Sequence, residues 1–222
     1  MKRGQANANF FKQAGGNDLG GGGDIMIAAP KHNPNIDYAA QANNNMAAGK
    51  SNVPQGPASQ KAIEAALKRA QQTGNLNLQG KGLKAFPSDI CNFNELRLID
   101  NFWEAYDLQK VDLSNNEIES IPEEIVNQET VVSFNFNTNK LAVVPNGLFA
   151  LPTLKFLDLS HNILGTKAVP NSYLSEAIGQ CQSLVELHLA GNQLTHLPES
   201  LGDLANLEIL NAKDNKLQAL PQ

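Results

Sequence analysis

Residues 184–207 read LVELHLAGNQLTHLPESLGDLANL, and this stretch decides the fold. Its leucines follow the spacing L-x-x-L-x-L-x-x-N-x-L, which begins at Leu184 and has its asparagine at Asn192. Four more copies of the pattern, with aliphatic or aromatic residues at the leucine positions, begin at Leu108, Val131, Leu154 and Leu207. Successive starts differ by 23, 23, 30 and 23 residues, so the chain is expected to be a stack of similar units.

Each copy places one residue between two apolar ones, an alternation typical of a short strand with one buried face. Units of this length stack so that each strand pairs in parallel with its neighbours. The asparagine follows the strand, where its amide can pair with turn backbone that would otherwise be buried without a partner. We expect a structural ladder of asparagines through the stack, formed by Asn116, Asn139, Asn162, Asn192 and Asn215.

Several copies continue with a hydrophobic residue and a proline, as at Ile121-Pro122 and Leu197-Pro198. The proline turns the chain towards the outer side of the stack, where stretches such as EEIVNQET should form short helices or 3₁₀ turns. The sequence therefore predicts an α/β solenoid, with short parallel strands on its concave side and helical or 3₁₀ turns on its convex side.

The array is expected to occupy residues 75–222. It begins with an imperfect copy at Leu76, in which Lys81 replaces the asparagine, and it contains a seven-residue insertion within residues 165–182. The chain stops at Gln222, directly after a Leu-Pro pair and without a polar capping repeat. We therefore expect an array truncated at its C-terminus, and an uncapped edge of this kind favours self-association.

Two segments precede the array. Residues 1–57 are rich in Asn, Gly and Ala, which predicts a disordered tail that is either a solvated arm or a docking arm. Residues 58–74 predict a helix, because Ile63, Leu67 and Ala70 fall on one face. We interpret this helix as a cap over the first repeat, since solenoids need covered ends; an amphipathic partner-binding helix is the alternative.

Residues 88–106 do not fit the repeat and contain Cys91, Phe93, Phe102, Trp103 and Tyr106. An aromatic cluster in an insertion can be a binding hot spot. Large aromatic side chains more often pack on a neighbouring core, and we favour that interpretation for this spacer.

Charge and composition exclude several functions. The tail carries five Lys/Arg and three Asp, whereas the remainder carries twelve Lys/Arg and nineteen Asp/Glu, a net charge of −7. So acidic a domain would repel phosphate backbones, and nucleic-acid binding is not expected. Cys91 and Cys181 give neither a zinc site nor a disulfide framework, and we expect no metal and no cofactor.

The apolar runs also limit where the protein can reside. No run reaches the ~18 residues of a membrane span, and the longest one near the N-terminus is too short for a signal peptide. We therefore expect a cytoplasmic protein, with the nucleus as the alternative. The missing signal peptide and glycosylation sequons disfavour a secreted receptor ectodomain.

The candidate binding surface consists of strand positions that face away from the core. Because the fold does not need apolar residues there, their identity is free to serve recognition. One column contains Lys110, Ser133, Phe156, Glu186 and Ile209. A second column contains Asp112, Asn135, Asp158, His188 and Asn211. We expect Phe156 and Ile209 to be exposed apolar anchors beside charged neighbours, although each position can equally be plain solvated surface.

The same surface contains the residue types of a catalytic triad. Asp158 and His188 would lie side by side on adjacent strands, with Ser160 two residues beyond Asp158. A flat, open sheet supplies neither an oxyanion hole nor exclusion of water, so we assign no catalytic residues and expect no enzyme activity.

The 23-residue copies with Leu-Pro resemble the intracellular, Ras-associated class of leucine-rich repeats. The runs TGNLNLQGKGLKAFP and NFWEAYDLQKVDLSNNEIESIP further resemble the N-terminal part of the leucine-rich repeat-containing protein 40 family, which also has a short leading helix, a Trp-bearing spacer and a basic residue at the position of Lys81. The resemblance covers roughly residues 60–222 and departs from that family at the early end and at the insertion after Leu164. It implies a right-handed horseshoe, further repeats downstream, an intracellular location and no catalytic residues.

These observations favour a non-catalytic, intracellular scaffold that binds partner proteins on its concave face. The alternative is a targeting or regulatory arm of a larger signalling enzyme, such as a kinase or ubiquitin ligase, with its catalytic domain beyond residue 222. Neither interpretation names the partner, because recognition depends on a few surface side chains.

Overall fold

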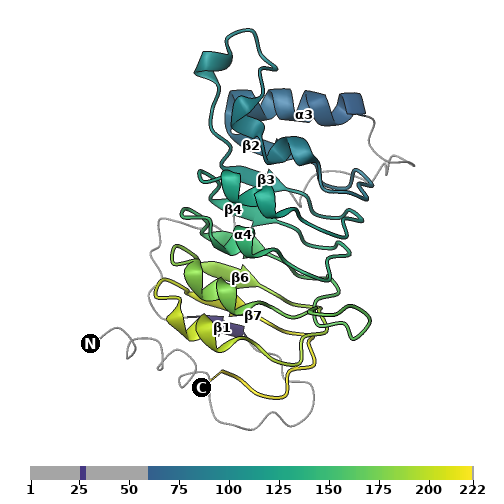
Figure 1. The fold of residues 1–222 in the computed structure, drawn as a ribbon, viewed down its shortest axis with the longest axis vertical. Coiled ribbons are helices and arrows are strands. Elements are labelled where there is room, and N and C mark those ends of the chain that lie inside the picture. The colour runs from purple at the N-terminus through teal and green to yellow at the C-terminus, as the bar shows by residue number, and fades with distance from the viewer. Residues whose placement is uncertain (1–25, 29–59, 222) are drawn as a thin grey trace.

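The computed structural model describes residues 26–28 and 60–221. Six parallel strands of three residues form one side of the molecule: β2 (Asn75–Asn77), β3 (Lys110–Asp112), β4 (Ser133–Asn135), β5 (Phe156–Asp158), β6 (Glu186–His188) and β7 (Ile209–Asn211). The strands pair in chain order, so each of these strands pairs with the strands of the repeats before and after it (Figure 1). The predicted fold of stacked repeats with parallel strands is confirmed.

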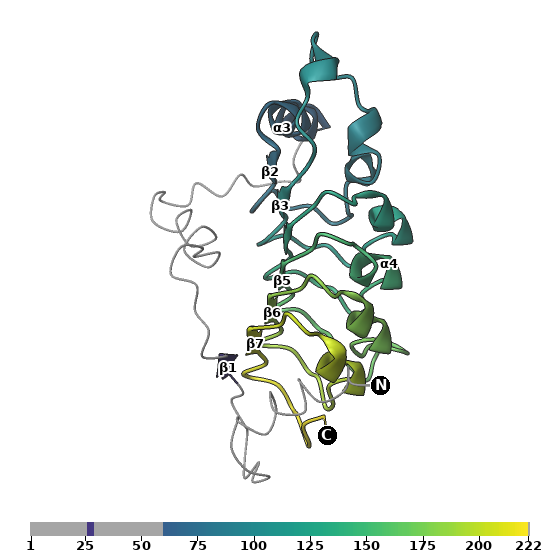
Figure 2. The same cartoon turned by 90° about the vertical axis from the view of Figure 1, so that its left-hand side faces the viewer.

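Short helices form the opposite side, as Figure 2 shows. They are the 3₁₀ helices η1 (Ser88–Ile90), η4 (Glu123–Asn127), η5 (Glu176–Gln180) and η6 (Glu199–Asp203), and the α-helix α4 (Asn146–Phe149). A proline in extended conformation directly precedes four of them, at Pro87, Pro122, Pro145 and Pro198. Proline fixes its own φ and cannot donate a ladder hydrogen bond, so it redirects the chain after each strand.

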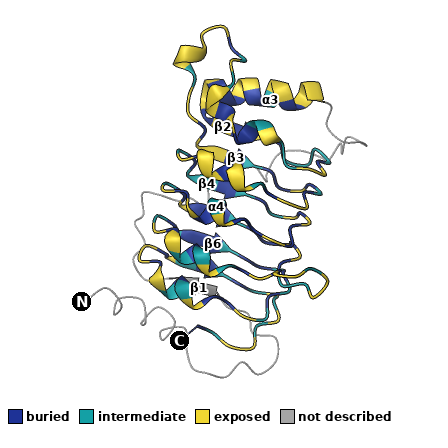
Figure 3. Ribbon diagram, in the orientation of Figure 1, coloured by how far each residue is buried: buried dark blue, intermediate teal, exposed yellow. Residues whose placement is uncertain are grey.

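The repeating apolar residues form one core between the two sides. Figure 3 shows that buried residues recur from repeat to repeat along the stack. The central residue of each array strand is inaccessible to solvent or nearly so, as at Leu157 and Leu187. Two phenylalanines of one repeat, Phe134 and Phe136, stack with their ring centroids 5.4 Å apart. Each repeat therefore contributes one layer to a continuous core.

The helix α3 (Gln60–Thr73) packs against β2 and covers that end of the core with Ile63, Leu67 and Ala70. It ends at Thr73, and the next residue, Gly74, has a left-handed φ of +71° and donates its N–H to the carbonyl of Ala70 at 2.7 Å. A Cβ atom at this position would lie 3.0 Å from the carbonyl oxygen of Asp107. Glycine therefore allows both the helix end and the close approach of the spacer.

Two irregular segments interrupt the array. The spacer before β3 contains the 3₁₀ helices η2 (Phe93–Glu95) and η3 (Phe102–Glu104). The insertion after β5 is held by Ser172, whose hydroxyl donates to the carbonyl of Ala142 at 2.8 Å and accepts from the N–H of Gly165 at 3.0 Å. Both segments leave the strand register undisturbed.

A further strand lies beside β7. Residues 26–28, inside the segment expected to be disordered, form β1 (Met26–Ala28), which pairs antiparallel with β7 and places Ile27 opposite Leu210. This is the side of β7 that would otherwise be free for self-association. The rest of residues 1–57 lies outside the described residues.

Candidate functional site on the concave face

The strand register brings the candidate binding residues together. Pairing of β3 through β7 places Lys110, Ser133, Phe156, Glu186 and Ile209 in one row across the sheet. The same pairing places Asp112, Asn135, Asp158, His188 and Asn211 in a second row. Between the rows lie the buried central residues of the strands, so both rows belong to the face opposite the short helices, which we call the concave face.

Eight of these ten residues keep partial or full exposure, whereas Phe156 and Glu186 are 7% and 5% exposed. The expectation that Phe156 is an exposed anchor is therefore wrong. Its ring lies against the imidazole of His188 on the next strand, with centroids 5.3 Å apart. The sequence predicted that Phe156 lies on this face of the sheet, but not that a neighbouring side chain shields it from solvent.

Glu186 and His188 complete a small cluster with Phe156. The Nε2 atom of His188 lies 3.5 Å from Oε2 of Glu186, on the same strand and two residues apart. We call Phe156, Glu186 and His188 the Phe156 cluster. It combines an aromatic ring, a buried carboxylate and an imidazole in one packed, partly desolvated group of the kind that can anchor a partner.

Residues of the second row have a structural role that the sequence interpretation missed. In five strands the third residue is Asn or Asp, and its Oδ1 accepts the N–H of the residue two positions later. These residues are Asn77, Asp112, Asn135, Asp158 and Asn211, at 3.0, 2.9, 3.0, 2.8 and 3.3 Å. Such turns end the strand and shield a backbone donor. The recurrence of Asn or Asp at this position was the available signal.

His188 is the exception in this row. It occupies the same position on β6, yet an imidazole takes the place of the turn-forming Asn or Asp, and its ring contacts Phe156 instead. A residue that departs from a repeated structural role is free to serve another one. This departure distinguishes the Phe156 cluster from the other positions of the concave face.

The asparagine ladder runs along the edge of the stack beside the strands. Asn162 shows the pattern: its Oδ1 accepts the N–H of Leu141 at 3.0 Å in the preceding repeat. Its Nδ2 donates to the carbonyls of Phe136 and Leu159, both at 3.0 Å. Asn116, Asn139, Asn192 and Asn215 make equivalent contacts. These side chains join one repeat to the next and face the interior, so they belong to the fold and not to the binding surface.

The residue types of a triad do not form a catalytic arrangement. Asp158 and His188 are register partners, but Oδ1 of Asp158 accepts the backbone N–H of Ser160 at 2.8 Å, and Ser160 is buried. His188 points to Glu186 and Phe156. Within the described residues no group of His, Cys, Asp and Glu side chains could hold a metal ion.

The two cysteines are buried free thiols of the core. Burial raises the pKa of the Cys181 thiol to about 12. Burial and the nearby carboxylate of Glu124 raise the pKa of the Cys91 thiol to about 11. Both groups are therefore protonated and unreactive at neutral pH, because the thiolate is the nucleophilic form.

Comparisons with known proteins agree with this architecture. Family models described as "Leucine rich repeat" match residues 106–164 and 183–204. The leucine-rich repeat and calponin homology domain-containing protein 1 of Mus musculus is 34% identical over 142 residues, which are 58% of this chain and 19% of that protein. The plant intracellular Ras-group-related LRR protein 8 of Oryza sativa subsp. japonica is 32% identical over 149 residues, 66% of this chain and 35% of its own length.

This chain thus spans between about a fifth and about a third of the length of these relatives. Among solved structures, the LRR ectodomain of the plant membrane receptor kinase GASSHO1/SCHENGEN3 from Arabidopsis thaliana, in complex with CASPARIAN STRIP INTEGRITY FACTOR 2, superimposes with a TM-score of 0.53 at 28% identity. That match covers 68% of this chain and 17% of the receptor chain.

In the described residues no helix is long and apolar enough to cross a bilayer. The resemblance to the leucine-rich repeat-containing protein 40 family stays a prediction. The parallel strand ladder, the five repeated asparagines and the two family matches converge on one conclusion: this chain is a leucine-rich-repeat protein.

Proposed function

We propose that the protein is a non-catalytic, intracellular scaffold that binds partner proteins on its concave face. The observation that carries this proposal is the Phe156 cluster, in which a buried carboxylate and an imidazole lie beside an aromatic ring at the middle of the sheet. Leucine-rich repeats generally mediate protein–protein interaction, and the repeat family is typically non-catalytic. We assign the cytoplasm as its location, with the nucleus as the alternative, in line with the similarity to a plant protein named as intracellular.

The ten row residues contribute unequally to the proposed surface. Asp112, Asn135 and Asn211 are each engaged in a turn through Oδ1, which leaves them one oxygen or amide group for a partner. Both oxygens of Asp158 already accept hydrogen bonds, from the N–H of Ser160 and from Nδ2 of Asn137. Lys110, Ser133 and Ile209 add a cation, a hydroxyl and an aliphatic side chain on the same row as the cluster. A polar partner segment lying across the strands would meet all of these groups in order.

The test compares proteins captured from cell lysate by the full chain and by two variants. His188→Ala removes the imidazole from the Phe156 cluster, and Gln180→Ala removes an exposed side chain from the opposite, convex side. We expect His188→Ala to lose a subset of partners that Gln180→Ala retains, with unchanged melting temperatures for both. Identical partner sets for the three proteins would exclude the concave face as the binding surface.

A second candidate function is that of a targeting or regulatory arm of a larger signalling enzyme. The similarity to the repeat ectodomain of a receptor kinase favours it, since repeats of this kind are joined to a catalytic domain in that protein. The full-length transcript is the test. A kinase or ubiquitin-ligase domain encoded downstream in frame would support this function, and further repeats followed by a stop codon would exclude it.

A further inference from the structure

The spacer between β2 and β3 carries the most exposed aromatic side chains among the described residues. Trp103 is 71% exposed and Tyr106 62% exposed, while Phe102 beside them is 38% exposed. The favoured expectation, that these aromatic residues pack on the adjacent repeats, is wrong for these three and holds for Phe93, which is buried in the core. So much aromatic surface gathered in one short segment is typical of an interaction site.

The segment is anchored to α3 at both ends. Gln71 of α3 is buried, and its side-chain amide donates to the carbonyl of Leu96 at 2.6 Å and accepts the N–H of Leu98 at 3.1 Å. The carbonyl of the same glutamine accepts the N–H of Tyr106 at 2.8 Å. Both ends of the aromatic segment are thus tied to the capping helix, which reduces the conformational freedom that is lost when a partner binds.

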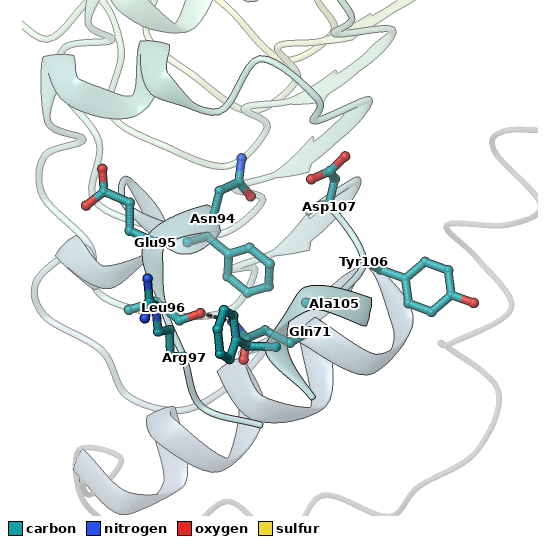
Figure 4. A pocket seen from close by; sticks show the side chains of 10 residues that line it. Gln71, Asn94, Glu95, Leu96, Arg97, Ala105, Tyr106 and Asp107 are labelled. Atoms are coloured by element: carbon teal, nitrogen blue, oxygen red, sulfur yellow. Dashed lines mark hydrogen bonds between the residues drawn. The ribbon is translucent and has the colours of Figure 1, made fainter. Parts of the chain in front are cut away.

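A hollow of about 620 Å³ lies beside these contacts (Figure 4). Its lining includes Gln71, Phe93, Arg97, Phe102 and Tyr106. Tyr106 and Asp107 extend from its rim, as the same view shows. An extended peptide can therefore place a side chain in the hollow while it crosses the exposed rings.

The aromatic surface already accepts a cation within the chain. The guanidinium of Arg97 lies over the ring of Phe102, with its Cζ atom 4.6 Å from the ring centroid. Trp103 meets Phe102 edge-on at 5.4 Å between centroids, which leaves the indole available for a similar contact. Indole is the best of the aromatic side chains for binding a cation.

The charge of the spacer itself is complementary to a basic partner. Residues 91–107 contain four acidic residues, Glu95, Asp100, Glu104 and Asp107, and one basic residue, Arg97. All four carboxylates are exposed, and across residues 60–221 none of them forms a salt bridge within the chain. An approaching cation is therefore attracted by the carboxylates and can rest on an indole.

From these observations we propose that Trp103, Tyr106 and the neighbouring carboxylates form a docking site for an arginine- or lysine-rich segment of a partner protein. The site is separate from the concave face, since it belongs to the spacer at the α3 end of the array (Figure 1). Its occupant is a basic peptide in extended conformation, which places one cationic side chain over Trp103 and others beside Glu104 and Asp107.

The experiment uses the full chain, because Trp103 is its only tryptophan and its fluorescence reports on this site alone. A short oligo-arginine peptide is the probe, and an oligo-glutamate peptide of equal length is the control. We expect a saturable change in Trp103 emission with oligo-arginine and none with oligo-glutamate. Absence of a saturable change with oligo-arginine would overturn the proposal.

Two double variants that change the net charge equally distinguish binding at the spacer from nonspecific electrostatic attraction. Glu104→Gln with Asp107→Asn removes the carboxylates beside the rings, and Glu119→Gln with Glu208→Gln removes two exposed carboxylates elsewhere. We expect the first variant to weaken binding about fivefold and the second to bind as the unchanged chain does. Equal weakening in both variants would contradict a site at the spacer.

A third variant tests whether this chain's own basic residues are the occupant. If replacing Lys2, Arg3 and Lys12 by glutamine changes Trp103 emission without any peptide, the site belongs to the N-terminal segment and the proposal of a partner is overturned. His188→Ala should leave oligo-arginine binding unchanged. Failure of the concave-face proposal and failure of this one are therefore distinguishable.

Discussion

The carboxylate of Glu176 accepts the backbone N–H of Ser200 from the following repeat, with its Oε2 atom 2.9 Å from the nitrogen. Its other oxygen accepts the N–H of Glu199 at 3.3 Å. Glu123 caps α4 in the same way, with Oε2 2.7 Å from the nitrogen of Gly147. A glutamate at the start of one convex turn thus satisfies free backbone donors at the start of the next.

Replacing this carboxylate should destabilise the protein in a pH-dependent way. The pKa of Glu176 is lowered, chiefly by the hydrogen bond that its carboxylate accepts from the backbone N–H of Ser200. A lowered pKa means that the stabilisation is present above the unfolded value of 4.5 and is lost as the pH falls through the folded value. Glu176→Gln should therefore lower the free energy of unfolding at pH 7 by about 0.3–1 kcal/mol.

Urea unfolding between pH 7 and pH 3 checks this expectation. The difference between Glu176→Gln and the unchanged chain should shrink as the solution is acidified. Glu129→Gln is the matched control, since it changes the same charge at an exposed position on the convex side. If the difference in unfolding free energy between Glu176→Gln and the unchanged chain did not depend on pH, this would argue against the capping role.

Thr138 has a strained backbone conformation that a substitution can relieve. The residue before every ladder asparagine has a left-handed backbone, and Thr138 has a φ of 56° at this position. A β-branched side chain is disfavoured there, whereas asparagine tolerates it, as Asn115 does in the repeat before. We expect Thr138→Asn to raise the free energy of unfolding by about 0.5–1 kcal/mol in urea titrations.

Gly191 occupies the same turn position in a later repeat, where a substitution should have the opposite effect on stability. It has a φ of +65°, and an added Cβ would lie very close to Nδ1 of His161. Gly191→Ala should therefore destabilise the protein by more than Thr138→Asn stabilises it. If Thr138→Asn proved neutral or destabilising, the hydrogen bond from the Thr138 hydroxyl to Asn137 would outweigh the backbone strain.

The fold followed from the sequence because each repeat fixes the same three things. Alternating apolar residues select the buried face, the asparagine ends the strand, and the spacing sets the register that pairs Asp158 with His188. These rules are local and apply in the same way to all five repeats, so a wrong prediction for one repeat does not change the prediction for the others. The insertion held by Ser172 was found from spacing alone, but its contacts with Ala142 were not.

The candidate site was harder to predict, because side-chain cover depends on neighbours that are distant in sequence. Phe156 was expected to be exposed, yet the imidazole of His188, thirty-two residues later, lies over it. Trp103 was expected to be packed, yet the short η3 helix holds it out in solvent. Periodicity predicts which way a side chain points but carries no information on what lies next to it.

Replacing an asparagine of the ladder should lower the free energy of unfolding more than most other single substitutions. Asn162 is buried and pairs with the N–H of Leu141 and the carbonyls of Phe136 and Leu159. Asn162→Ala leaves these groups without partners, so we expect a loss of about 2–4 kcal/mol in the free energy of unfolding. Asn215→Ala should cost less, because Asn215 is only half-buried and water can replace its amide. Equal losses for the two variants would contradict this account.

Disruption of β1 should expose an edge that can pair with a second molecule. Residues 26–28 occupy one side of β7. Alternate N–H groups of a strand point to the same side, so Ile27→Pro together with Ala28→Pro removes a donor towards β7 in either register. We expect the variant to dimerise at concentrations where the unchanged chain does not, measured by sedimentation. The same two prolines at Ala39 and Ala40 are the control, and dimers in both variants would exclude β7 as the cause.

The buried thiol of Cys181 should make the protein unstable to alkali. Its pKa is raised to about 12 by burial, above the ordinary value of 9.0 that applies in the unfolded chain. The folded state therefore holds the proton more tightly, and its advantage is full below pH 9 and disappears as the pH rises towards 12. Urea unfolding of Cys181→Ala should show a lower stability at pH 7, from the lost packing, but a shallower decline above pH 9 than the unchanged chain. Parallel declines for the two proteins would show that the alkaline transition comes from other groups.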